Sequence, residues 1–180
     1  MTSTNTTANG WAALEKRLDG IPKPTRTLAL CADPDVRDRY QAAKQAHQRA
    51  SNYLQSLPKN AEKDARALAT SQVAEAAAHL EAVKQEYDAI TVTLTFQALE
   101  RGELEDLRSQ HPATEEDEEL GRDFHFDTFA PALISASSVD GMPVEYAQQA
   151  MKKWSLTDSD DLWNVAWAVQ QRKRSDLGKG

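Results

Sequence analysis

Residues 33–57 read DPDVRDRYQAAKQAHQRASNYLQSL, and this stretch decides the fold of the chain. Asp33 and Pro34 form a strong helix start, an N-cap residue followed by proline at the first helical position. Apolar and small residues then recur at spacings that alternate between four and three, which predicts a heptad seam along one face of the helix. The seam comprises Val36, Tyr40, Ala43, His47, Ala50, Leu54 and Leu57.

A second helix of similar length is predicted directly after the first. The sequence Pro58-Lys59-Asn60 breaks the first helix, and the second runs from about Ala61 to Tyr87. Its seam repeats the same spacing through Ala69, Val73, Ala76, Leu80, Val83 and Tyr87. Two such helices joined by a short turn predict an antiparallel helical hairpin.

A strand pattern stands on either side of the hairpin. Residues 90–96 read ITVTLTF, a strict alternation of period two with threonines on one face, and Thr25–Cys31 carries a weaker version of the same signal. Antiparallel helices return the chain to its starting point, so we expect Thr25–Cys31 and Ile90–Gln97 to pair antiparallel. Leu28 and Leu30 should then face the same core as Val92 and Leu94, with the Phe124–Phe129 region covering that apolar face.

The last third of the chain predicts several shorter helices. Leu99, Leu104 and Leu107 belong to one helix limited by Pro112, and an acidic loop follows over residues 114–119. Further helices are predicted through Pro131–Ser137, from Pro143 to Trp154, and from an N-cap at Thr157 onward. The fold class expected is mainly α with a small two-stranded antiparallel β element, the long hairpin inserted between the strands, and a compact C-terminal helical unit after them.

Four segments are expected along the chain. They are a flexible N-terminus with a short helix (1–24, with Trp11, Leu14 and Leu18 on one face), the strand–hairpin–strand segment (25–99), a C-terminal helical domain (100–171) and a loose basic tail (172–180).

Composition excludes several classes of partner and compartment. The formal net charge of −7 repels phosphate backbones, so no nucleic acid is expected as a partner. No apolar run approaches the ~20 residues that cross a bilayer, and the N-terminal residues lack the apolar core of a signal peptide. Cys31 is the only cysteine, which fits a reducing cytosol. We therefore expect a soluble, intracellular protein without a membrane partner.

No catalytic or cofactor motif emerges from the sequence. The glycines form no phosphate-binding loop, and Cys31 has no basic neighbour in sequence that would lower its pKa. Asp123, His125 and Asp127 alternate, and the interpretation as a polar edge anchored by interleaved phenylalanines is preferred over a metal site. His47 is interpreted as a polar seam residue. The prediction is a non-enzyme with no cofactor and no bound metal.

Aromatic residues of the last third are the candidate binding residues. Trp154, Trp163 and Trp167 are three of the four tryptophans, and Trp163 and Trp167 share a helix face because they are four apart. We take these three with Phe129 as candidates for partner binding, as the lining of a groove for an apolar helix. The alternative is that they form the core of the C-terminal helical unit.

The second half of the chain resembles the tail assembly chaperones of long-tailed, siphovirus-type actinobacteriophages. The likeness covers residues 90–171 and rests on an order of segments: ITVTLTFQAL, LEDLRSQHPA, an acidic gap, FHFDTFAPALISAS, a Val-Glu-Tyr helix and SLTDSDDLWNVAWAVQQ. The alanine-rich charged hairpin at 34–88 is similar to the segment that these proteins carry upstream.

This resemblance implies a function in the host cytoplasm. Such a chaperone binds the tape measure protein, a very long helical chain with exposed apolar stretches, and keeps it soluble until the tail tube assembles around it. The tail tube protein and a longer, frameshifted form of the same protein are further partners to consider. Leu177-Gly178-Lys179 is compatible with the slip-prone codons CTG-GGA-AAG, which reading the gene would test.

Two other classes of protein fit the same sequence. One is a structural tail or adaptor protein that uses the hairpin as a coiled-coil spacer and stays in the particle. The other is a bacterial coiled-coil regulator unrelated to phage, which would be encoded away from tail genes.

Overall fold

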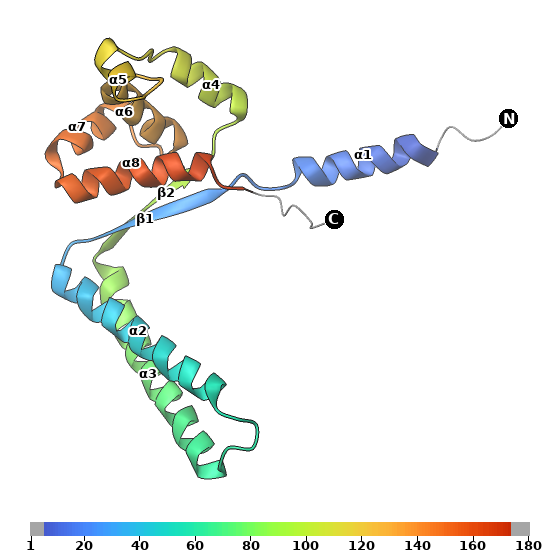
Figure 1. The fold of residues 1–180 in the computed structure, drawn as a ribbon, viewed down its shortest axis with the longest axis vertical. Coiled ribbons are helices and arrows are strands. Elements are labelled where there is room, and N and C mark those ends of the chain that lie inside the picture. Colours follow the sequence, from blue (N-terminus) through green and yellow to red (C-terminus); the bar gives the residue numbers. More distant parts are fainter. Residues whose placement is uncertain (1–5, 174–180) are drawn as a thin grey trace. The chain divides into compact units, whose positions relative to one another are not determined.

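The chain forms eight helices and two strands over residues 6–173, the part described by a computed structural model (Figure 1). In chain order these are α1 (Thr6–Asp19), β1 (Thr25–Cys31), α2 (Pro34–Ser56), α3 (Lys63–Ala89), β2 (Thr91–Gln97), α4 (Arg101–Ser109), α5 (Glu115–Glu119), α6 (Phe126–Ser137), α7 (Val144–Lys153) and α8 (Leu156–Gln170). A mainly helical chain with a long helix pair between two antiparallel strands confirms the predicted fold class.

The predicted pairing of β1 with β2 is confirmed. The Ala98 N–H donates to the Pro24 carbonyl oxygen over 2.9 Å, and the Ala32 N–H donates to the Ile90 carbonyl oxygen over 3.2 Å. These two bonds bracket the ladder and give the same register at both of its ends. The strands are therefore paired without a bulge.

The apolar face of the sheet is covered differently from the prediction. Leu28 and Leu94 share one core, as expected, but Val92 is 61% exposed. That core is built mainly from buried residues of β2, α6, α7 and α8. Side chains on one face of a strand recur about every 6.6 Å, so Val92 lies one such step beyond Leu94 and outside this cluster.

Phe124 and Phe129 also do not cover the sheet, contrary to the prediction. They belong to a separate cluster with Leu133, whereas Ile134 joins the cluster that contains Leu28 and Leu94. The reason is that α6 is one continuous helix, on which Phe129 and Leu133 share one face and Ile134 faces another.

The hairpin formed by α2 and α3 follows the predicted start and seams. The Asp33 side chain caps α2 by accepting from the Asp35 N–H over 2.8 Å and the Val36 N–H over 3.3 Å. Val36 and Ala43 on α2 are buried, as are Ala69 and Val83 on α3. Every predicted seam residue of both helices, including His47, is at least partly buried.

Two cross-helix contacts fix the hairpin near its strand end. The rings of Tyr40 and Tyr87 stack with centroids 4.4 Å apart. The Arg39 guanidinium donates two hydrogen bonds, of 2.7 and 2.9 Å, to the Glu86 carboxylate. Both pairs join residues on opposite helices of the hairpin, so they define the register of α2 against α3.

The C-terminal helices pack against one another and hold the larger core. Phe96, Leu133, Ile134, Leu162 and Val169 are fully buried. Gly141 makes the turn between α6 and α7 with φ of 74°, a conformation that favours glycine. The N-cap of α8 is Ser155 and not the predicted Thr157, because the Ser155 Oγ accepts from the Asp158 N–H over 3.2 Å.

Contacts divide the chain into two units, one of residues 29–93 and one of the residues on either side of them. The predicted short helix near the N-terminus is α1, whose Trp11, Leu14 and Leu18 are exposed. Most of the predicted basic tail, from residue 174 onward, lies outside the described residues. No helix within residues 6–173 combines the length and apolar character that a bilayer crossing requires.

Candidate functional site

Trp163 and Trp167 lie together on one face of α8, as their spacing predicts. Their rings stack with centroids 5.3 Å apart and planes inclined by 17°. Both side chains are partly exposed, so the pair belongs to the core on one side and to the surface on the other. Indole rings stacked in this way present a continuous apolar surface.

Three phenylalanines from the start of α6 and the residues before it complete the group. Phe126 meets Trp163 edge-on with centroids 5.1 Å apart, and Phe124 lies 4.4 Å from Phe129. Phe129 is fully buried and lies 6.2 Å from each indole, edge-on to both. We call Phe124, Phe126, Phe129, Trp163 and Trp167 the aromatic cluster.

The structure brings together three of the four candidate residues predicted from the sequence. Phe129 is the buried base of the aromatic cluster, and Trp163 and Trp167 reach its surface. Trp154 packs against the other core cluster, the one that Leu28 and Leu94 also contact, and has no ring contact with the aromatic cluster among the described residues. Trp163 and Trp167 can therefore contact a partner directly, whereas the buried Phe129 cannot.

Two arginines border the aromatic cluster. The Arg122 guanidinium lies 4.9 Å from the ring centre of Phe126, and that of Arg108 lies 5.8 Å from the ring centre of Phe124. Each cation–π contact of this exposed kind contributes about 0.5–1 kcal/mol. The aromatic surface is thus bordered by two guanidinium groups.

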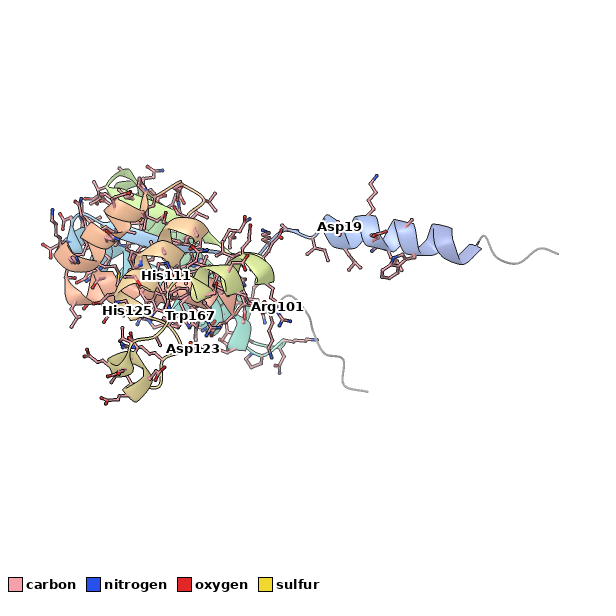
Figure 2. The ribbon with its side chains drawn as sticks, turned by 90° about the horizontal axis from the view of Figure 1, so that it is seen from above. Asp19, Arg101, His111, Asp123, His125 and Trp167 are labelled. Atoms are coloured by element: carbon pink, nitrogen blue, oxygen red, sulfur yellow. The ribbon has the colours of Figure 1, made fainter. Side chains whose placement is uncertain are left out.

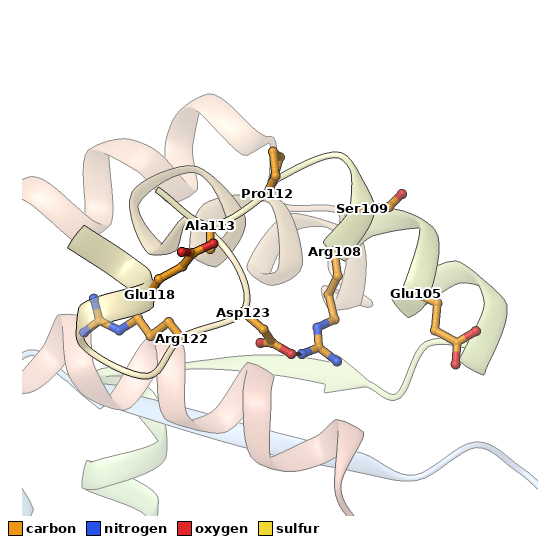
Figure 3. Close-up of a pocket in the computed structure, with 8 residues that line it drawn as sticks. All are labelled: Glu105, Arg108, Ser109, Pro112, Ala113, Glu118, Arg122 and Asp123. Carbon is orange, nitrogen blue, oxygen red and sulfur yellow. Dashed lines mark hydrogen bonds and ion pairs between the residues drawn. The ribbon is translucent and has the colours of Figure 1, made fainter. Parts of the chain in front are cut away.

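The same two arginines line an open hollow of about 620 Å³ between α4 and α5 (Figure 3). Arg108 and Asp123 point toward one another in this hollow and form an ion pair. Glu105 and Glu118 add carboxylates to the same lining, so the hollow is a mixed-charge surface.

Asp117 holds the segment between α4 and α6 in place. It is 5% exposed although it stands inside the acidic run, and this run forms the short helix α5 instead of the predicted loop. Its carboxylate accepts from the Thr114 hydroxyl over 2.7 Å, and Asp117 Oδ2 lies 2.8 Å from His125 Nδ1. Arg122 Nη1 approaches the other carboxylate oxygen to 3.6 Å.

These contacts change the acidity of the buried carboxyl. The hydrogen bond from the Thr114 hydroxyl, followed by that from His125, lowers the pKa of Asp117 well below its usual range. Asp117 is therefore ionised at neutral pH and fixes His125, which lies between Phe124 and Phe126 in sequence. Asp117 thereby holds the backbone that carries two phenylalanines of the aromatic cluster. Figure 2 labels His111, His125 and Trp167.

The alternating polar residues Asp123, His125 and Asp127 do not form a group that could hold a metal ion. Asp123 pairs with Arg108, His125 pairs with Asp117, and Asp127 is exposed in the first turn of α6. Within residues 6–173 no group of three or more His, Cys, Asp and Glu side chains is placed to hold a metal ion. Cys31 is partly exposed, and its Sγ lies 3.2 Å from the Asp33 carbonyl oxygen.

Sequence reasoning did not foresee the roles of Asp117, Arg108 and Arg122. A signal existed for Asp117, since Thr114 stands three residues before it and forms a reciprocal capping box with it. Arg108 meets Phe124 from α4, which no local pattern reveals, whereas Arg122 lies only four residues before Phe126.

Comparison with profiles of known protein families, with curated proteins and with solved structures gives no match.

Proposed function

We propose that this protein is a phage tail assembly chaperone that binds the tape measure protein and keeps it soluble in the host cytoplasm during tail assembly. The proposal rests on the resemblance of residues 90–171 to that family. The observation that carries it is the stacked, partly exposed Trp163–Trp167 pair above the fully buried Phe129.

The aromatic cluster has the properties that a site for an apolar helix needs. Tryptophan dominates the energetics of protein interfaces because a rigid, flat ring buries a large area at small entropic cost. The indoles of Trp163 and Trp167 are held by Phe129 beneath them, so little order must be gained on binding. The net charge of −7 would add repulsion between complexes and keep a covered apolar chain in solution.

Co-expression with the tape measure protein tests this function. The soluble fraction of the tape measure protein should rise with the wild-type chain and fall toward the uncomplexed level with Trp163→Ala or Trp167→Ala. A hot-spot tryptophan is worth about 2 kcal/mol or more, so the dissociation constant should rise about 30-fold or more.

Trp154→Ala is the matched control, because it removes the same side chain from the other core cluster. Circular dichroism must show each variant folded. Unchanged solubility with the wild-type chain, or an equal loss of binding in Trp154→Ala, contradicts the proposal. Unfolding of both Trp163→Ala and Trp167→Ala assigns the pair to the core alone.

A structural tail or adaptor protein is the second candidate, favoured by the hairpin. Helices of 23 and 27 residues with a continuous seam suit a spacer. Purified virions distinguish the two, since a chaperone is absent from the finished tail and a spacer is present. The position of the gene relative to tail genes separates both from a bacterial coiled-coil regulator.

A further inference from the structure

The outer edge of β1 leaves backbone groups without a partner strand. In an antiparallel pair, hydrogen-bonded residues alternate with residues whose N–H and C=O groups point away from the neighbouring strand. The Pro24 carbonyl accepts from the N–H of Ala98, the residue directly after β2, so Thr25 and Thr27 direct their backbone groups to the outer edge. The Thr25 carbonyl confirms this direction by accepting from Arg172 Nη1 over 2.8 Å.

On the other edge of the sheet, the outward backbone groups of the β2 residue opposite Thr27 are hydrogen-bonded. Thr95 lies opposite Thr27; its N–H donates to Asp140 Oδ2 over 2.6 Å, and its carbonyl accepts from the Val139 N–H over 2.8 Å. For Thr27, no residue between 6 and 173 supplies such a bond to its N–H or C=O group. At this pair of residues the edge of β2 is thus closed and the edge of β1 is open.

A positively charged hollow runs along the open edge. Its volume is about 450 Å³, and it is lined by Thr25, Arg26, Thr27, Val165 and Arg172. The lining contains two guanidinium groups and no carboxylate, in a chain whose net charge is −7. Arg26 is exposed and forms no ion pair with any residue between 6 and 173.

We propose that the open edge of β1 binds an extended, acidic peptide segment of a partner protein by strand addition. The backbone of such a segment would exchange hydrogen bonds with the N–H and C=O groups of Thr27, while its carboxylates would face Arg26 and Arg172. Main-chain bonds supply affinity in this mode of recognition, and side chains supply specificity. Paired guanidinium groups favour carboxylates because their planar donors match carboxylate geometry.

A helical partner does not fit this edge. A helix satisfies its own backbone groups and leaves those of Thr27 unpaired. The edge therefore selects a partner segment of different chemistry from the apolar helix proposed for the aromatic cluster. The two proposals rest on different residues, and either can fail without the other.

The test uses the full chain and two fluorescent octapeptides, one alternating glutamate with valine and one alternating lysine with valine. Fluorescence anisotropy at low salt should show saturable binding of the glutamate peptide and none of the lysine peptide. Arg26→Glu should weaken binding about tenfold or more, since the change replaces an attraction by a repulsion at the strand edge. Arg49→Glu, the same charge change at an exposed position on α2, should leave the affinity unchanged.

Backbone pairing is tested separately from charge. The glutamate peptide should slow amide exchange at Thr27 in the wild-type chain, and a version N-methylated at alternate residues should not bind. Thr27→Pro removes the outward N–H and should also abolish binding, provided circular dichroism shows a folded chain.

Several results overturn the proposal. These are equal binding of both peptides, equal loss in Arg49→Glu, retained binding of the N-methylated peptide, and no binding of the glutamate peptide at all. A dimer in sedimentation that Thr27→Pro dissociates would also overturn it, because a second copy of this chain would then occupy the edge.

Discussion

Asp117 stands in an acidic run of five residues and is nevertheless buried, bonded to Thr114 and His125. Its lowered pKa means that the folded state holds the ionised form more strongly than the unfolded state does. A group of this kind contributes stability that is complete above its ordinary pKa and is lost as the pH falls through the lowered value. The segment between α4 and α6 should therefore become less stable as the pH falls.

The substitution Asp117→Asn tests this dependence. The melting temperature of the wild-type chain should fall as the pH drops below 3.8, the usual pKa of the carboxyl, and the fall should be shallower in Asp117→Asn. At neutral pH the variant should be the less stable of the two, because the ionised carboxylate is what Thr114 and His125 bind. Thermal unfolding followed by circular dichroism between about pH 7 and about pH 2 measures both effects.

Glu116→Gln is the matched control, since Glu116 is the exposed neighbour of Asp117 in α5. The melting temperature of Glu116→Gln should depend on pH as steeply as that of the wild-type chain. If the melting temperatures of the wild-type chain and Asp117→Asn fall equally steeply with pH, the carboxylate does not stabilise the fold through its ionised form.

Ala69 shows at the scale of an element why the hairpin is rich in alanine. It is 1% exposed on α3, and Ala43, also buried, stands on the seam of α2. Small side chains let two helices approach closely, so a larger side chain at this seam must push them apart.

Ala69→Leu should therefore destabilise the hairpin by about 1–3 kcal/mol, the usual cost of overpacking. Ala67→Leu, an exposed position on the same helix, should change the free energy of unfolding by less than about 0.5 kcal/mol. Denaturant titration of both variants measures the difference. If Ala69→Leu lowers the free energy of unfolding no more than Ala67→Leu does, the seam accommodates a larger side chain without strain.

The hairpin and the sheet could be predicted because each rests on a regular period. The seams from Val36 to Leu57 and from Ala69 to Tyr87 repeat every three or four residues, and all their members are at least partly buried. The start of α8 could not be fixed in the same way. Ser155 and Thr157 both precede an aspartate by three residues, so local chemistry supports two caps and only packing selects Ser155.

The candidate site was predictable in part for a related reason. Trp163 and Trp167 are neighbours on one helix, and helical spacing alone places them together. Trp154 is close in sequence but packs against the other core cluster. Phe124, just before α6, and Arg108, on α4, lie far from the tryptophans in sequence. Contacts between distant elements depend on tertiary packing, which no period encodes.

At the scale of the whole molecule, the buried apolar residues are unevenly distributed. Of the seventeen buried hydrophobic residues among those described, four lie in the hairpin, namely Val36, Ala43, Ala69 and Val83, and thirteen lie between Phe96 and Val169. Local free energies of opening follow the apolar area that a segment buries. The hairpin should therefore open more easily than the helices around α6 and α8.

Native-state hydrogen exchange at increasing denaturant measures these two levels. Amides of α2 and α3 should exchange through an opening of lower free energy than amides of α6 and α8, which should exchange only through global unfolding. Leu162→Ala removes a fully buried side chain from α8. It should lower the free energy of the opening that exposes the α6 and α8 amides by about 2–5 kcal/mol. Ala69→Leu should instead lower the level of the hairpin. If each substitution shifts the exchange of all four helices equally, the chain unfolds as one cooperative unit, and the division at residues 29–93 has no energetic counterpart.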